Sequence, residues 1–268
     1  MRVTLLGTGG SAGVPMIGGA DGRGDWGSCD PLEPRNRRTR ASIVIEGDDG
    51  QRLLVDTAPD MRAQLLDCAI PRVDAILYTH AHADHITGID DVRILNRILG
   101  RPIEAFGTAA TLEEISGRFR YAFRPWKPPG FFRPVLEARP VRAGEVARIA
   151  GLDLRLFTQD HGMIESMGMR VGRLVYSTDV VRFDESTFDS LMDIDTWIVD
   201  CFTKGTPHPT HANLKTVLSW VDRLRPRRTI LTHMGTDMDW AWLRANLPAG
   251  VEPGYDGMVI DLPQAVPV

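Results

Sequence analysis

The sequence predicts a single α/β domain over residues 1–268, with two sheets packed face to face and helices on their outer sides. Stretches with strand patterns and stretches with helix patterns alternate along the chain, without a clear linker and without an internal repeat. A chain of 268 residues with 43% hydrophobic content can bury one large core or two small ones. These observations favour one continuous domain of the α/β class.

The individual elements follow from local patterns. Strands are predicted at residues 2–6, 42–46, 52–56, 75–78, 152–157, 171–176, 196–200 and 229–232. The second and third of these flank Gly-Asp-Asp-Gly, a good hairpin turn. Helices are predicted at residues 86–99, at about 213–224 and, as a short one, at about 240–246. The first of these helices has its apolar residues at helical spacing.

The seven residues after the strand at 75–78 carry the strongest chemical signal in the chain. Residues 79–85 read Thr-His-Ala-His-Ala-Asp-His, which places three of the chain's seven histidines and a carboxylate within six positions. Imidazole nitrogen and carboxylate oxygen are ligands that zinc and manganese accept. The spacing offers more ligands than one tetrahedral ion needs, so it indicates two neighbouring metal ions rather than a solvated polar loop.

This heptapeptide, with Gly88 shortly after it, resembles the signature of the metallo-β-lactamase-fold hydrolases. The resemblance implies a four-layer αββα sandwich and further ligands scattered along the chain. His161, Asp179 and His233 each follow a predicted strand. Taken singly, each could be an ordinary polar residue at the end of a strand, but their order and setting match the superfamily pattern and favour ligands.

The resemblance also implies how two divalent ions would be held. His80, His82 and His161 would bind the first ion, Asp84, His85 and His233 the second, and Asp179 would bridge both. Two ions about 3.5–4 Å apart lower the pKa of a shared water and stabilise the attacking and leaving oxygens. As a ligand of one of these ions, Asp84 would serve catalysis as well as binding. Asp56 resembles the superfamily's acid that orients a ligating histidine, with a plain turn residue as the alternative.

Three further segments resemble the PhnP-type phosphodiesterases, which hydrolyse a ribosyl cyclic phosphate in phosphonate breakdown. They are residues 5–15, residues 230–233 and residues 242–258, and the resemblance extends with gaps over nearly the whole chain. It implies that His211 is a catalytic histidine outside the metal ligands, where an imidazole could protonate a departing alkoxide or hold a phosphoryl oxygen. The alternative for His211 is a polar residue at the start of a helix, and the nearby His208 is expected to be a bystander.

Two segments are candidates for substrate contact. Arg37 and Arg38 match a paired arginine of the PhnP-type sequences, which allows either a phosphate contact or a structural one. The stretch 118–132 mixes aromatic rings with arginine and lysine. It could stack a nucleobase over the site, or it could pack as a proline-rich loop over the core.

Two other sites are expected to be absent. Some PhnP-type proteins hold a structural zinc on clustered cysteines, but the matching loop here offers only Cys29, and Thr236 stands where an extra histidine would fall. Residues 7–12 satisfy the loose dinucleotide fingerprint, yet the glycines and proline that follow cannot sustain the helix which that fingerprint needs. A tight loop near the metal rim is the better interpretation of this segment.

Charge, hydropathy and cysteine content narrow the class of protein. A net charge of −4 argues against broad electrostatic binding of nucleic acid. The sequence shows neither an apolar run of about 18 residues nor a basic N-terminus followed by an apolar stretch, so neither a membrane span nor a secretory signal is expected. Cys29, Cys68 and Cys201 are far apart and odd in number, which indicates free thiols in a cytoplasmic protein.

Together these features predict a dinuclear metal-dependent hydrolase, most consistent with a phosphodiesterase in which activated water attacks cyclic or small nucleotide-like phosphodiesters. Its partner would be that small substrate, with no membrane and no stable nucleic-acid complex. Two alternatives stay open: a hydrolase of the same fold that acts on a thioester, a β-lactam or the 3′ end of tRNA, and a non-catalytic metal and nucleotide binder. Zinc and manganese both accept these ligands, and the oligomeric state, a homodimer included, stays open.

Overall fold

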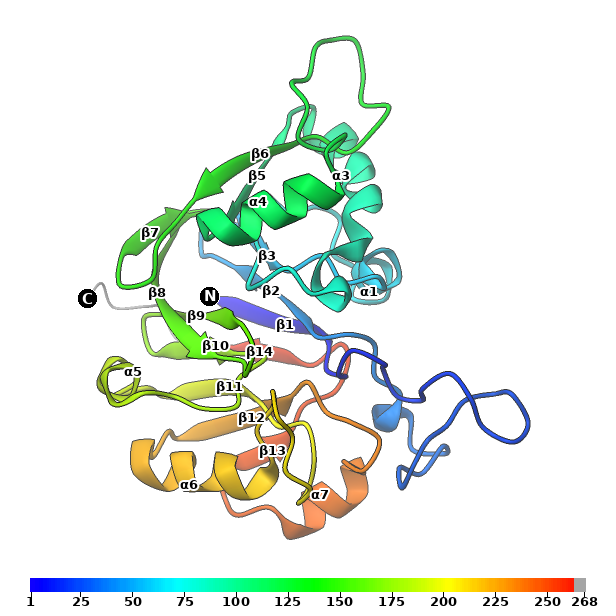
Figure 1. Ribbon diagram of the computed structural model, residues 1–268, viewed down its shortest axis with the longest axis vertical. Helices are drawn as coiled ribbons and strands as arrows, with labels where there is room; N and C mark the ends of the chain where they lie inside the picture. Colours follow the sequence, from blue (N-terminus) through cyan, green and yellow to red (C-terminus); the bar gives the residue numbers. More distant parts are fainter. Residues whose placement is uncertain (263–268) are drawn as a thin grey trace.

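Two mixed β-sheets pack against each other in the computed structural model, which describes residues 1–262 (Figure 1). The first sheet consists, in spatial order, of β14 (Val259–Asp261), β1 (Arg2–Gly7), β2 (Ser42–Glu46), β3 (Arg52–Val55), β4 (Ala75–Leu77), β5 (Ile103–Gly107) and β6 (Leu136–Pro140). The strands from β14 to β3 pair antiparallel, and those from β3 to β6 pair parallel. The parallel strands therefore end at the same edge of the sheet.

The second sheet comes from the second half of the chain. In spatial order it consists of β13 (Val251–Pro253), β12 (Arg228–Thr232), β11 (Thr196–Asp200), β10 (Leu174–Ser177), β9 (Glu165–Val171), β8 (Leu152–Asp160) and β7 (Val146–Ile149). The strands from β10 to β13 pair parallel, and those from β7 to β10 pair antiparallel. As a result β8, β10, β11 and β12 all run in one direction and end at one edge.

Helices cover the outer face of each sheet, and the expected four-layer αββα sandwich is confirmed. The α-helices are α1 (Met61–Asp67), α2 (Ala83–Ile86), α3 (Val92–Leu99), α4 (Ala109–Arg118), α5 (Glu185–Ser190), α6 (Leu214–Leu224) and α7 (Trp240–Asn246), and the short 3₁₀ segments are η1 (Pro34–Asn36) and η2 (Thr87–Asp91). In Figure 1, α1, α3 and α4 lie over the first sheet, and α5, α6 and α7 lie over the second. Within residues 1–262, none of the helices has the length and apolar content that crossing a bilayer requires.

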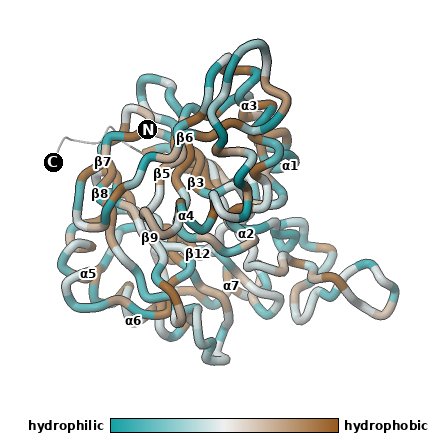
Figure 2. Tube along the Cα trace, turned by 45° about the horizontal axis from the view of Figure 1, so that its top comes forward, coloured by the Kyte–Doolittle hydropathy of each residue, from teal (hydrophilic) through white to brown (hydrophobic). Residues whose placement is uncertain are grey.

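Three apolar layers follow from the alternation of side chains along the strands. In β1, Val3 and Leu5 point between the two sheets, whereas Leu6 points toward the helices of the first sheet. In the second sheet, Tyr176 faces the inter-sheet core and Trp197 packs toward α6. Hydrophobic residues accordingly concentrate along the strands in Figure 2, while much of the periphery is hydrophilic. The inter-sheet core fixes the two sheets in the register that the site requires.

One predicted strand was wrong in its boundaries. The stretch 171–176 is not one strand, because Gly172 and Arg173 form a two-residue turn between β9 and β10. Val171 pairs with Leu174 across this hairpin, and Gly172 has a φ of 56°, which glycine adopts readily. The hydrophobic residues on both sides of the turn conceal it in the sequence.

The helix expected at residues 86–99 is broken into α2, η2 and α3. The Cα of Gly88 packs directly on the carbonyl oxygen of Ala58, where any side chain would clash, and its N–H donates to the Thr57 carbonyl at 2.9 Å. This tertiary contact draws the chain out of the α-helical path, so the helical spacing that the sequence shows is interrupted. The helices at 214–224 and 240–246 agree with the prediction.

Candidate metal centre

The segment after β4 turns its histidines toward the space between the sheets. His82 has extended backbone angles and precedes α2, so Asp84 and His85 stand on the first turn of that helix. The preceding Thr79 is held by Asp56, whose two carboxylate oxygens accept from the Thr79 N–H and hydroxyl, each at 2.8 Å. The strand end and the helix start are thereby fixed relative to each other.

Three residues at strand ends adopt a left-handed backbone conformation that is uncommon for side chains other than glycine. Asp56 has a φ of 64°, Asp179 a φ of 55° and His233 a φ of 55°. Such conformations are costly for L-residues, and they persist where the surroundings hold them, often at functional sites. Here each of the three strands β3, β10 and β12 is followed by such a strained residue. The strained backbone directs its side chain to the edge at which the two sheets meet.

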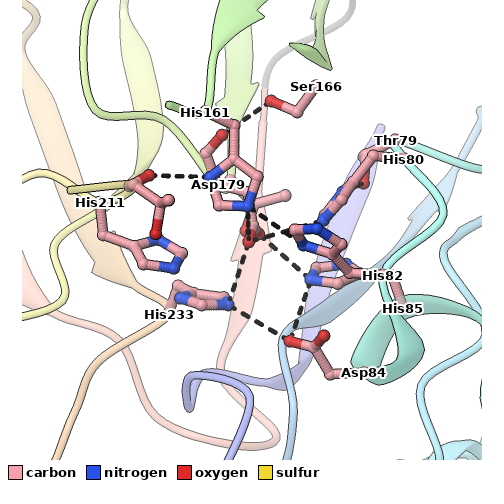
Figure 3. A network of polar contacts seen from close by, with 12 residues as sticks. Thr79, His80, His82, Asp84, His85, His161, Ser166, Asp179, His211 and His233 are labelled. Carbon is pink, nitrogen blue, oxygen red and sulfur yellow. Dashed lines mark hydrogen bonds and ion pairs between the residues drawn. The ribbon is translucent and has the colours of Figure 1, made fainter. Parts of the chain in front are cut away.

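Asp179 lies at the centre of the cluster (Figure 3). Its Oδ1 lies 3.4 Å from His233 Nε2, 3.5 Å from His161 Nε2 and 3.8 Å from His80 Nε2. Its Oδ2 lies 3.2 Å from His85 Nε2. A single carboxylate therefore faces imidazoles from both sheets, which is the arrangement that a bridging ligand requires.

The remaining contacts divide the cluster into two groups. His161 Nε2 lies 3.2 Å from His82 Nδ1, and His80, His82 and His161 have ligand atoms within 4.8 Å of one another. On the other side, Asp84 Oδ2 lies 3.3 Å from His85 Nε2 and 3.7 Å from His233 Nε2. The structure thus brings all seven residues named as ligands in the sequence analysis into one cluster. Its two groups correspond to the division expected there.

The chemistry of this donor set fits divalent cations. Within residues 1–262, the Nε2 atoms of His80, His85 and His233 are buried without a hydrogen-bond partner, an arrangement that is costly unless another group satisfies them. Burial lowers the pKa of His80, which keeps its imidazole neutral and its lone pair free. Although burial opposes it, the neighbouring His233 and His85 hold the pKa of Asp179 well below its ordinary value. Although burial opposes it, Asp179 in turn raises the pKa of His85 and of His233. A bound zinc or manganese ion would take the place of the protons on these two rings.

The other ring nitrogen of three of these histidines, His80, His85 and His161, is held by the protein. His85 Nδ1 lies 2.8 Å from Asp56 Oδ2, and His161 Nδ1 lies 2.8 Å from the Thr210 carbonyl oxygen. His80 Nδ1 lies 3.0 Å from the Thr79 hydroxyl. Such partners fix the orientation of a ligating ring and leave Nε2 toward the ion. Asp56 is placed to orient His85 in this way.

His211 lies beside the cluster and has its own acidic partner. Its Nδ1 lies 2.8 Å from Asp200 Oδ2, and its ring stacks on that of His233 at 4.6 Å between centroids. Asp200 is fully buried at the end of β11 and also accepts from the Val180 N–H at 3.0 Å. This pairing fixes the His211 ring and leaves its Nε2 for another partner.

Asp200 was missed in the sequence analysis. The available signal was its position, because it ends the apolar strand at 196–200, which runs parallel to the strands before Asp179 and His233. A lone carboxylate in that position has no spacing motif, and its pairing with His211 arises only when the loop from residue 201 to 213 folds back.

The surroundings of Arg38 favour the structural one of the two contacts expected for it over substrate binding. The side chain is buried, and its Nη2 donates to the Met238 carbonyl at 2.6 Å and to Asn36 Oδ1 at 3.3 Å. Its Nη1 contacts the Cys29 thiol at 4.0 Å. A guanidinium committed to these groups cannot reach a phosphate. Arg37 is exposed, and its guanidinium lies 5.2 Å from the centroid of the Trp26 ring.

The aromatic and basic segment forms a loop from residue 119 to 135, which projects at the top of Figure 1. Trp126 stacks on Phe131 with 4.5 Å between centroids and an interplanar angle of 5°. Its Nε1–H donates to the Gly130 carbonyl at 2.9 Å. The Trp126 ring is thus engaged within its own loop, which favours the packing interpretation of this segment.

The glycine-rich loop after β1 lies against the segment that carries His233. Gly10 donates to the Met234 carbonyl at 3.2 Å, so this loop borders the cluster as expected. Asp256 anchors it from the C-terminal region. Its Oδ1 accepts from the N–H and hydroxyl of Thr8 at 2.9 and 2.8 Å, and its Oδ2 accepts from those of Thr39 at 2.7 and 2.6 Å.

Comparison with known proteins agrees with this architecture. The sequence model of a family described as "Beta-lactamase superfamily domain" matches residues 51–234. The crystal structure of a new diphosphatase from the PhnP family is similar over 99% of both chains, with a TM-score of 0.86 and 31% sequence identity.

Two curated proteins are similar in sequence. An octanoyltransferase of Porphyromonas gingivalis is 28% identical over 260 residues, which are 96% of this chain. The chain spans only about half the length of that relative, 51%. The anti-Pycsar protein Apyc1 of Bacillus phage 010DV004 is 26% identical over 227 residues, which cover 77% of this chain and 86% of that protein.

Proposed function

Because the chain belongs to the metallo-β-lactamase superfamily, whose members include metal-dependent hydrolases, we propose that it is a dinuclear phosphodiesterase acting on cyclic or small nucleotide-like phosphodiesters. The observation that carries this proposal is the cluster of five imidazoles and two carboxylates with Asp179 at its centre, with His211 held next to it by Asp200. The likeness to a PhnP-family diphosphatase over 99% of both chains supports phosphorus chemistry.

In this proposal the two groups of the cluster hold one cation each. His80, His82 and His161 would hold the first ion, Asp84, His85 and His233 the second, and Asp179 would bridge them. Two divalent ions there would activate a water and neutralise charge on the phosphoryl oxygens. The protein residues keep that arrangement rigid, because Asp56 fixes the His85 ring and the Thr210 carbonyl fixes the His161 ring.

His211 would protonate the leaving group. Its Nδ1–H donates to Asp200 at 2.8 Å, so Nε2 is left free to take up a proton from solvent and to deliver it to the departing oxygen. The buried Asp200 carboxylate fixes the tautomer and the orientation of the ring. A group in this position, which touches the cluster without belonging to its two ligand groups, suits a general acid.

Replacing His211 tests this assignment. In His211→Asn the side-chain amide can still donate to Asp200, but the Nε2 proton donor is gone. We expect kcat for a phosphodiester to fall about a hundredfold to ten-thousandfold, which is the usual contribution of general acid catalysis. Bound metal, measured by elemental analysis, should stay unchanged. Loss of metal in this variant, or full activity in it, would contradict the role given to His211.

Acyl thioester hydrolysis at the same cluster is the second candidate. It is favoured by the likeness of 96% of this chain to about half of a protein named octanoyltransferase. A hydrolysis panel on metal-loaded protein separates the two candidates. It compares a 2′,3′-cyclic nucleotide, a cyclic ribose phosphate and an aryl phosphodiester with an octanoyl thioester and a β-lactam. Turnover of the thioester alone would replace the phosphodiesterase proposal, and no turnover at all would favour a binding protein.

A further inference from the structure

Two rings lie next to His211 that belong to neither ligand group and take no part in the proposed proton transfer. Phe202 and His208 stand on the loop that joins β11 to α6. The Phe202 ring lies 5.0 Å from the His211 ring and 4.9 Å from the His208 ring, between centroids. The His208 ring lies 5.1 Å from that of His211. Phe202 and His208 are both partly exposed, whereas His211 is buried.

The Phe202 ring fits in its place because two neighbouring residues are glycines without a side chain. A Cβ atom at Gly10 would come within 2.7 Å of Phe202 Cε2, and one at Gly235 would lie 3.4 Å from the same atom. The backbone of Phe202 is fixed as well, because its N–H donates to the Ala212 carbonyl at 2.9 Å. A large apolar ring is thus held at a defined place next to the cluster while part of it stays in contact with solvent.

His208 has a defined tautomer. Its Nδ1 lies 3.4 Å from the Thr210 nitrogen and 3.2 Å from the Thr210 hydroxyl oxygen. Because a backbone N–H can only donate, Nδ1 accepts and the ring proton is on Nε2. Burial lowers the pKa of His208, which favours this neutral form. The His208 ring therefore offers one N–H donor beside the partly exposed Phe202.

We infer that Phe202 and His208 form the subsite for the leaving group and that this subsite takes the planar base of a nucleoside. The inference rests on the proposed function, because His211 is the group that protonates the leaving oxygen. Any substituent on that oxygen must lie near His211, whose partly exposed neighbours on this loop are Phe202 and His208. An aromatic ring stacks on any base, and the Nε2–H of His208 can donate to a base or ribose oxygen.

Paired substrates test the subsite. We compare 2′,3′-cyclic AMP with the methyl riboside 2′,3′-cyclic phosphate, which has the same reacting atoms but no base. In Phe202→Leu, KM for the cyclic nucleotide should rise about tenfold, the scale of one base–aromatic stack, with kcat nearly unchanged. KM for the base-free substrate should not change. His208→Asn keeps an acceptor for Thr210 and should likewise raise KM only for the nucleotide.

Binding gives a readout that does not depend on turnover. Calorimetric titration of metal-loaded protein with AMP and with ribose 5-phosphate should show tighter binding of AMP, and Phe202→Leu should remove most of that difference. Gly10→Ala should weaken AMP binding in the wild-type background by displacing the ring, and should have little further effect in Phe202→Leu. Phe132→Leu is the matched control, because Phe132 is 79% exposed on the projecting loop 119–135 and should change nothing.

The outcomes separate the subsite from the proposed reaction. If the protein hydrolyses no phosphodiester but binds AMP through Phe202, the proposed function fails, the leaving-group role is overturned with it, and the binding of a base at Phe202 is supported. If both cyclic phosphates are hydrolysed and Phe202→Leu changes neither KM, the subsite is overturned and the activity stands. An equal loss on both substrates would also overturn it, because the ring would then support the reacting groups rather than a base.

Discussion

Asp56 shows how much a single side chain can determine in this centre. It adopts a φ of 64°, is completely buried, and joins the N–H and hydroxyl of Thr79 to Nδ1 of His85. Burial raises the pKa of this carboxyl, and contact with His85 opposes that rise. One residue thus connects the end of β3 with the start of the ligand segment and with the ring of one ligand.

Asp56→Asn should weaken the second ion specifically. The substitution keeps the shape of the side chain but removes the charge that orients His85 and raises its basicity, so we expect about a 10-fold to 100-fold loss of affinity for one of two ions. Competition with a chromophoric chelator would measure both affinities. Asp48→Asn, at an exposed turn, is the control. Equal affinities in wild type and Asp56→Asn would refute the role of Asp56.

At the scale of elements, the sequence predicted those features that depend on local pattern. The ligands were recognisable because His161, Asp179 and His233 each end an apolar strand and residues 80–85 carry a dense motif. Asp200 has no such motif, and Gly88 breaks a helical pattern only through its contact with Ala58. The burial of Arg38 could not be predicted either, because a run of basic residues does not show which of them points into the protein. Tertiary contacts decided each of these cases.

The contact between Asp256 and the first loop leads to a prediction about pH. Burial raises the pKa of Asp256 to about 6, although hydrogen bonds from Thr39 and Thr8 oppose the shift. The ordinary value is 3.8, so the stability that this group contributes is present below pH 3.8 and is lost as the pH rises through about 6.

The difference in unfolding free energy between wild type and Asp256→Asn isolates this group, because other groups titrate alike in both proteins. Urea unfolding should show the wild type losing about 2 kcal/mol relative to the variant between pH 4 and pH 7. A difference that stays constant with pH would contradict the shifted pKa.

At the scale of the whole molecule, the metal centre joins the two sheets. The ligand segment at residues 80–85 follows β4 of the first sheet, whereas His161, Asp179 and His233 follow strands of the second. The inter-sheet core holds the sheets together from one side of this edge, and bound cations would hold them from the other. Metal should therefore stabilise the fold and not only the site.

Removal of metal should lower the melting temperature. At a free ion concentration about 1,000 times Kd, one bound ion contributes about 4 kcal/mol to stability, which corresponds to roughly 10 °C for a chain of this size. Differential scanning calorimetry with and without a chelator measures the change. Asp179→Ala is the matched control, since a protein without the central carboxylate should respond little. A wild-type melting temperature that does not respond to the chelator would rule out tightly bound metal.

All seven histidines of the chain are gathered within one small region: the five of the two ligand groups, His211 next to them, and His208 beside His211. Imidazole resonances of the whole protein would consequently originate from this region alone. Isotopic labelling of histidine should give a spectrum without background, in which metal loading, proton exchange and nucleotide occupancy can each be followed ring by ring.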